Sequence, residues 1–193
     1  MNCQAPLNAA TLADYWLGLL PQLEEEPVEE HLFSCEDCNA RLAEIIALAQ
    51  GLRELAREGS LRVVVSETFL ERAAAEGLRV RQYAPPSGGK VDCTVTLEDD
   101  LLIGRLAADL SGARRVDLAI CDESGVERMR MADIPFRPGE GTLLFQESIT
   151  RAKAAPSEVM IARLVAVDDS GAERTVGEYT FNHTRTIAGP PGW

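Results

Sequence analysis

Apolar side chains recur at helical spacing through the first sixty residues. In residues 9–20 they repeat every three or four positions and end against Pro21, which predicts a first helix. A short second helix is expected from Pro27, because proline suits a first helical position. A third helix is expected to begin at the cap residue Ser34 and to end at Gly59. The pattern therefore predicts a small helical domain.

The pattern changes after a fourth predicted helix over residues 67–76, which lies between Ser66 and Gly77. The stretch 84–89 is rich in proline and glycine and indicates a turn or hinge. Residues 91–183 then alternate short apolar, β-branched runs with Gly, Pro and Asp turns, which is typical of an antiparallel β-sandwich of about seven strands.

The expected fold class is therefore α+β and multidomain, with a small helical domain followed by an antiparallel β-sandwich. The predicted organisation is a helical domain over 1–60, a fourth helix and linker over 61–90, a sensing or scaffold β-sandwich over 91–183 and a tail over 184–193.

One motif occurs twice in the β region. Residues 122–128 and 168–174 share the pattern Asp-x-Ser-Gly-x-Glu-Arg, and each follows an apolar run. The simplest interpretation is one type of hairpin turn used twice, and a paired cation site is the alternative.

Charge narrows the classes of partner. The chain of 193 residues carries a net charge of −12, which argues against a DNA- or RNA-binding protein, since such proteins carry basic patches. Residues 1–60 are the most acidic part and suit a basic protein partner.

No apolar run approaches the roughly 18 to 20 residues of a membrane helix, and the N-terminus lacks signal-peptide features. We expect a cytoplasmic protein, whose clustered cysteines indicate a metal site or a redox switch.

The informative cluster is His31, Cys35 and Cys38. The first two are four residues apart, so one helical turn places them on the same side. Cys35 and Cys38 are three residues apart at the start of a helix, where backbone amides favour the thiolate form that zinc binds. A closed structural zinc shell has four ligands, and Cys3, just ahead of the first helix, is the candidate for the fourth. The predicted cofactor is therefore Zn²⁺, held by Cys3, His31, Cys35 and Cys38.

The C-x-x-C pair taken alone has two alternative interpretations. It is either a coincidental buried pair or a thioredoxin-like redox motif, although the latter expects a βαβ context that residues 1–60 lack. Cys93 shares the phase of the apolar side chains around it and is expected in the core, whereas the role of Cys121 stays open. P-loop, G-x-S-x-G and dinucleotide motifs are absent, so we do not expect an enzyme.

These residues resemble a known family. Tyr15-Trp16-Leu17-Gly18-Leu19-Leu20, an acidic spacer and the segment from Glu30 to Leu42 look like the zinc-binding anti-sigma domain. The resemblance covers about the first third of the chain and is closest to the soluble subgroup with a C-terminal β domain. It implies a three-helix zinc core with Cys3 as the N-terminal ligand. It also implies a fourth helix that embraces an extracytoplasmic-function sigma factor and blocks the surfaces that meet RNA polymerase.

The expected sigma surface is the C-terminal half of the third helix together with the fourth helix, within an apolar stripe that runs along the third helix. Ordinary core packing is the competing interpretation of the same side chains. They are Leu42, Ile45, Ile46, Ala49, Leu52, Phe69 and Leu70.

The main functional expectation is thus an anti-sigma factor that sequesters its partner until a signal releases it, with no direct contact to nucleic acid or membrane. A zinc-stabilised protein–protein adaptor without a sigma partner is the alternative. A zinc-finger nucleic-acid binder is disfavoured by charge. Release by cysteine oxidation is open, because Glu36 and Asp37 disfavour the reactive thiolate in the metal-free state.

Overall fold

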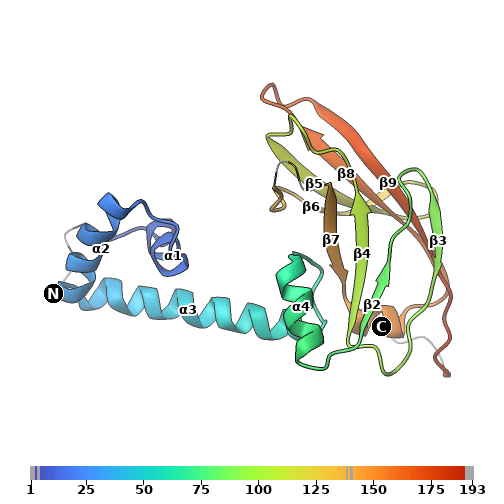
Figure 1. Ribbon diagram of the computed structural model, residues 1–193, viewed down its shortest axis with the longest axis horizontal. Helices are drawn as coiled ribbons and strands as arrows, with labels where there is room; N and C mark the ends of the chain where they lie inside the picture. Colours follow the sequence, from blue (N-terminus) through green and yellow to red (C-terminus); the bar gives the residue numbers. More distant parts are fainter. Residues whose placement is uncertain (1–2, 4, 138, 140, 190–193) are drawn as a thin grey trace. The chain divides into compact units, whose positions relative to one another are not determined.

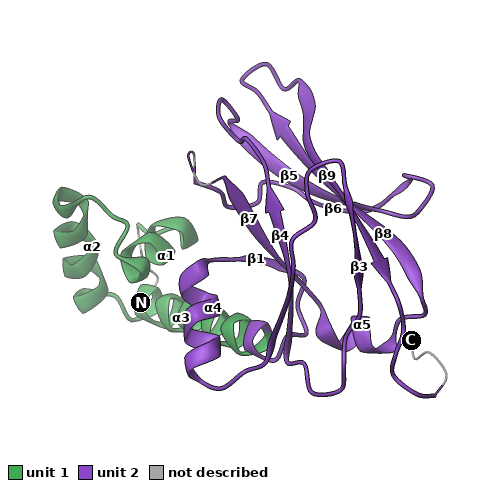
Figure 2. Ribbon diagram, turned by 45° about the vertical axis from the view of Figure 1, so that its right-hand side comes forward, with its two compact units in different colours: residues 1–55 green, residues 56–193 purple. Residues whose placement is uncertain are grey.

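The computed structural model describes residues 3, 5–137, 139 and 141–189 (Figure 1). The chain forms two compact units, residues 1–55 and 56–193 (Figure 2). In chain order the first helices are α1 (Ala9–Leu17), α2 (Gln22–Ser34) and α3 (Glu36–Arg57). The elements that follow are β1 (Val63–Val65), α4 (Glu67–Ala75), β2 (Val80–Tyr83), β3 (Lys90–Cys93), β4 (Leu101–Ala107), β5 (Arg115–Cys121), β6 (Glu127–Met131), β7 (Thr142–Glu147), α5 (Ile149–Ala154), β8 (Glu158–Val167) and β9 (Glu173–His183).

Three predicted helix ends in the first unit are corrected by the structure. Gly18 adopts a left-handed conformation with φ 67° and ends α1 at Leu17 rather than at residue 20. The second helix begins at Gln22, so Pro27 lies inside it and not at its start. Ser34 closes α2 instead of capping α3, because its hydroxyl donates to the carbonyl oxygens of Glu30 and His31. The three helices themselves are confirmed, and the errors concern only where they begin and end.

Two sheets of the second unit pack face to face. Their strand orders are β1-β7-β4-β2 and β3-β9-β8-β5-β6. One shared core takes side chains from both sheets, such as Leu106 and Phe145 from the first and Leu118, Leu164 and Tyr179 from the second. The predicted α+β organisation is confirmed. The sheets are mixed, since β2 pairs with β4 and β3 pairs with β9 in parallel.

The fourth helix belongs to the second unit. Ser66 caps α4 by accepting a hydrogen bond from the backbone N–H of Phe69 at 3.2 Å, as the sequence predicts. Leu70 is 5% exposed and packs with Ile103 and Leu144. The range expected as helix and linker, 61–90, therefore lies inside the β unit, where Leu70 is part of the core.

The two repeated Asp-x-Ser-Gly segments are hairpin turns. Asp122 accepts hydrogen bonds from the backbone and hydroxyl of Ser124 and from the backbone of Val126. Asp168 repeats these contacts with Ser170 and Ala172. Hydrogen bonding to Ser124, helped by Arg128, lowers the pKa of Asp122 to about 2. These carboxylates are occupied by their own turns, which supports the simple interpretation of the repeat.

The predicted tail, 184–193, is attached to the β unit where it is described. The backbone N–H of Thr184 donates to the Cys93 carbonyl at 2.8 Å, and that of Arg185 donates to the Ser157 hydroxyl at 3.0 Å. Residues 190–193, most of the end expected to be loose, lie outside the described residues. In the described part of the chain no helix has the length and apolar character needed to cross a membrane.

A buried carboxylate stabilises one face of the second sheet. Asp117 on β5 is fully buried and accepts hydrogen bonds from Arg115, from Arg130 and from the backbone N–H of Asp133. Burial alone raises the pKa of a carboxyl, but the Asp133 N–H and the two guanidinium groups outweigh it and hold the pKa of Asp117 below its usual value. The charged form is therefore the one that stabilises the fold.

We predict that Asp117→Asn lowers the free energy of unfolding of the β unit by about 2 kcal/mol at pH 7, because it leaves two arginines without their buried charge partner. Since the folded-state pKa is depressed, this stabilisation is present above the unfolded pKa of about 4 and is lost as pH falls toward the folded value. Urea unfolding of both proteins at pH 7 and pH 3 measures the difference. The control is Asp169→Asn, which removes an exposed ion pair with Arg114 and should leave unfolding unchanged. An equal effect of both variants contradicts the assignment.

Candidate metal centre

Four potential metal ligands meet in the first unit. The ligand atoms of Cys3, His31, Cys35 and Cys38 all lie within 4.8 Å of one another. These are the four residues that the sequence predicts, including Cys3, which is 28 residues from the nearest of the others in the chain. The group can hold a metal ion.

The junction between α2 and α3 positions three of the four. His31 lies in the last turn of α2, and Cys38 lies in the first turn of α3. Cys35 separates the two helices in an extended conformation, with φ −123° and ψ 102°. This single non-helical residue turns the chain, so that both helix ends direct a ligand toward the same point. In the spacing H-x3-C-x2-C, the histidine therefore lies at the end of one helix, the first cysteine at the corner and the second cysteine at the start of the next helix.

The three separations among the ligand atoms of Cys3, His31 and Cys38 are short and similar. His31 Nε2 lies 3.2 Å from Cys38 Sγ and 3.5 Å from Cys3 Sγ, and the two sulfurs are 3.9 Å apart. Cys38 is fully buried, whereas the other three are partly buried. The backbone N–H of Cys3 donates to Asp37 Oδ2 at 3.3 Å. This hydrogen bond attaches the N-terminal segment to the first turn of α3 and holds Cys3 near the other ligands.

The two more exposed thiols are shifted in opposite directions. A hydrogen bond from the backbone N–H of Cys38 lowers the pKa of Cys35, as expected for a sulfur that faces the amides of an opening helix. Burial, followed by interactions with Cys35, raises the pKa of Cys3. The site therefore favours a thiolate at the α2–α3 corner. A cation held among the four side chains favours the thiolate form of the others.

The apolar core of this unit is very small. Its buried members are Leu12 from α1, Val28 and Leu32 from α2 and Cys38 from α3. A core of this size seldom stabilises a domain of some fifty residues, and natural domains of this size commonly add a metal ion or disulfides. Because Cys38 is both a ligand and a core residue, metal binding and core packing act at the same place.

The predicted partner-binding residues occupy three environments. Leu42 and Ile45 pack against the small core, and Ile46 and Ala49 are partly buried. Leu52 is 50% exposed. Phe69 and Leu70 belong to the second unit and pack against its sheet. The residues predicted for one surface therefore do not form a single described surface.

Two exposed residues on α3 were missed. Leu48 is 66% exposed and Leu55 is 42% exposed, and with Leu52 they follow the spacing i, i+4, i+7. We call Leu48, Leu52 and Leu55 the α3 stripe. The helical spacing of these leucines can be read from the sequence. Only the structure shows that they are exposed, unlike the neighbouring positions that pack against the core. A contact between the guanidinium of Arg53 and the ring of Trp16, 4.8 Å from its centroid, joins α1 to the same half of α3.

The remaining cysteines and the second histidine lie in the other unit. Cys93 packs beside the core of the sandwich, as predicted, and burial raises its pKa to about 11. Cys121, whose role the sequence leaves open, is 1% exposed at the end of β5. His183 ends β9. None of the three belongs to the Cys3–His31–Cys35–Cys38 group.

Comparison with known proteins shows only remote structural similarity. No protein-family profile matches the sequence, and no curated protein matches it. Among solved structures, the fibronectin(III)-like modules of Clostridium thermocellum CbhA match 55% of this chain and 98% of their own at 16% identity and a TM-score of 0.33. CopC from Methylosinus trichosporium OB3b matches 66% and 98% at 11% identity and a TM-score of 0.29. The N-terminal domain of phage TP901-1 ORF48 matches 55% and 98% at 10% identity and a TM-score of 0.34. At TM-scores this low, the similarities carry no functional information.

We predict that Cys38→Ser lowers the bound metal from about one equivalent per chain to near zero and unfolds the helical unit, because the variant loses a ligand at the centre of the small core. Cys3→Ala should weaken metal binding by more than the roughly 10- to 100-fold typical of losing an outer-shell partner. Elemental analysis and competition with a chelator measure both effects.

The control is Cys93→Ala, which removes a thiol from the other unit and should keep the metal. Circular dichroism should show that Cys38→Ser loses helix while the strands of the β unit persist, since the core of that unit contains no metal ligand. Unchanged metal content in Cys38→Ser contradicts the ligand assignment.

Proposed function

We propose that the first unit is a zinc-stabilised anti-sigma domain that binds an extracytoplasmic-function sigma factor in the cytoplasm and keeps it from RNA polymerase. One observation carries the proposal. The four side chains expected from the sequence resemblance converge in a small helical unit whose long helix, α3, leaves an apolar stripe exposed. The first feature supplies the scaffold, and the second supplies a surface for a protein partner.

The donor set supports zinc as the metal. Three sulfurs and one imidazole form a common structural zinc shell. With Zn–S bonds of about 2.3 Å and a Zn–N bond of about 2.0 Å, tetrahedral geometry requires sulfurs about 3.8 Å apart and sulfur–nitrogen separations of about 3.5 Å. The observed Cys3–Cys38 separation is 3.9 Å, and His31 Nε2 lies 3.5 Å and 3.2 Å from the same sulfurs. Four protein ligands leave no open position for a reacting water, which favours a structural role.

The α3 stripe supports a protein partner. Three leucines at i, i+4 and i+7 form a continuous apolar face, and an exposed apolar face of this kind commonly docks into a groove of another protein. Residues 1–60 are acidic, which suits a partner with basic surfaces such as a DNA-binding factor. The fourth helix fits a sigma-binding role less well, because Leu70 is buried against the β sheet. The proposed sigma surface is therefore α3 alone.

We expect the purified protein to contain one equivalent of zinc, in preference to iron, cobalt or copper, because the group matches tetrahedral zinc geometry. Elemental analysis of protein expressed without added metal tests this. Stoichiometric iron would replace zinc in the proposal and make redox chemistry the more natural role of the site.

We predict that the tagged protein captures a sigma factor from its native cell and that the double variant Leu48→Asp/Leu52→Asp loses it, with affinity at least tenfold lower. Charged side chains on the α3 stripe cannot enter an apolar groove. Mass spectrometry identifies the captured protein, and titration with that protein measures affinity. Leu97→Asp is the matched control, since Leu97 is 69% exposed but lies in the other unit.

Repeating the capture with a mild oxidant separates two ways of release. Loss of the sigma factor together with zinc supports a cysteine switch, whereas retention moves the signal away from the metal site. Repeated capture of a partner other than a sigma factor, sensitive to the same leucine variants, would favour the adaptor and overturn the sigma proposal.

A further inference from the structure

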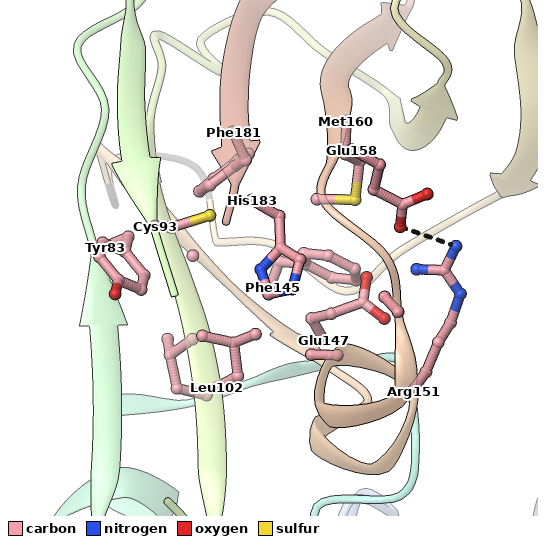
Figure 3. A pocket seen from close by; sticks show the side chains of 14 residues that line it. Tyr83, Cys93, Leu102, Phe145, Glu147, Arg151, Glu158, Met160, Phe181 and His183 are labelled. Atoms are coloured by element: carbon pink, nitrogen blue, oxygen red, sulfur yellow. Dashed lines mark ion pairs between the residues drawn. The ribbon is translucent and has the colours of Figure 1, made fainter. Parts of the chain in front are cut away.

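The second unit contains a cavity between its two sheets, of about 50 Å³ (Figure 3). It lies where the ends of β2, β4 and β7 meet those of β3, β8 and β9, and α5 forms part of its wall. At roughly 10–15 Å³ for each water-sized group, it has room for about four non-hydrogen atoms. Its apolar lining includes the aromatic rings of Tyr83, Phe145 and Phe181 and the side chain of Met160.

Two buried polar atoms on this wall have no hydrogen-bond partner. Among the described residues, Glu147 Oε2 and His183 Nε2 are buried oxygen and nitrogen atoms with no hydrogen-bond partner. The Glu147 side chain is only 8% exposed, and its other oxygen accepts from Arg62 at 2.6 Å and from the backbone of Ser148 at 3.0 Å. Buried polar atoms are almost always paired, so two unpaired atoms beside one cavity indicate a bound molecule.

Both unpaired atoms are hydrogen-bond acceptors. Burial lowers the pKa of His183, and nearby Arg151 and Arg185 lower it further, although Glu158 opposes them, so the ring is neutral near pH 7. Interaction with the backbone of Ala152 raises the pKa of His183 and so opposes the effect of burial. A neutral imidazole has one N–H and one acceptor nitrogen, and we assign the acceptor to Nε2, the nitrogen without a partner. A carboxylate oxygen is likewise acceptor only.

The aromatic rings on the wall favour a cation over an anion. The two carboxylates of the wall are each paired with an arginine, Glu158 with Arg151 at 3.3 Å (Figure 3) and Glu147 with Arg62 at 2.6 Å, so these ion pairs add no net charge. The neutral His183 and the protonated Cys93 thiol add no charge. A preformed metal site is not indicated, because Cys93, Glu147 and His183 are not among the described groups whose ligand atoms lie within 4.8 Å of one another.

We infer that this cavity binds a small primary alkylammonium ion, whose NH₃⁺ group donates to Glu147 Oε2 and His183 Nε2 and whose carbon chain lies against the aromatic rings. An ammonium group offers three donors to two acceptors, whereas an alcohol offers one, and a carboxylate offers none. The inference does not depend on what the first unit binds, and it gives the β domain a chemically defined ligand.

The test is a titration of the full-length, metal-loaded protein with n-propylammonium chloride, followed by NMR. We expect saturable shifts of the His183 ring and of amides on β7 and β9, with a dissociation constant of about 1 mM, a strength within reach of four non-hydrogen atoms. Sodium chloride at equal ionic strength is the blank. 1-Propanol and sodium propionate should each bind at least tenfold more weakly. Equal binding of propanol, or no saturable shift with propylammonium because the cavity holds only ordered water, overturns the inference.

Three variants locate the site. Ala152→Leu places a larger apolar side chain in the cavity from α5 and should abolish binding, while His183→Phe should weaken it at least tenfold. Glu147→Gln should weaken it similarly but also loses the ion pair with Arg62, so its control is Glu178→Gln, which breaks a more exposed ion pair with Arg163 and should leave binding unchanged. Unchanged binding in Ala152→Leu, with the variant folded, places the ligand elsewhere and contradicts the inference.

Discussion

The shortage of buried apolar surface in the first unit is the constraint on which the rest of that unit depends. Only Leu12, Val28, Leu32 and Cys38 form its buried core among the residues that the structure describes. Even with the partly buried side chains that pack against it, this is a small apolar core for some fifty ordered residues. A metal ion held by Cys3, His31, Cys35 and Cys38 would add stabilisation, because it would join the chain around Cys3, α2 and α3 at one point. Because Cys38 belongs to both the core and the ligand set, loss of the metal ion would also disturb the packing of the core.

The two halves of α3 differ in their exposure. The first turns of α3 carry Cys38 and the core contacts of Leu42 and Ile45, whereas Leu48, Leu52 and Leu55 on its later turns are exposed. Single exposed leucines are ordinary, but three at helical spacing along one face form an apolar patch. The proposed function follows from this division of α3, with metal and core residues at its start and a partner surface along its later turns.

The second unit satisfies the same physical requirements by ordinary means, with a sandwich core drawn from both sheets. Its buried polar groups differ in how completely they are hydrogen-bonded. Asp117 is fully paired by Arg115, Arg130 and a backbone N–H, so it has a structural role. Glu147 and His183 each leave one buried atom unpaired beside the cavity. The contrast distinguishes a carboxylate that holds the fold from one that is prepared for a ligand.

The sequence alone determined what depends on local spacing. His31, Cys35 and Cys38 lie within eight residues, so helix geometry was enough to bring them together, and the need for a fourth ligand identified Cys3. The alternation of apolar runs likewise predicted the β domain. Only the tertiary structure decided that Leu70 packs against a sheet, that β2 and β3 pair in parallel with β4 and β9, and that Glu147 and His183 share a cavity. Those facts depend on contacts between residues far apart in the chain, which no periodicity within one segment encodes.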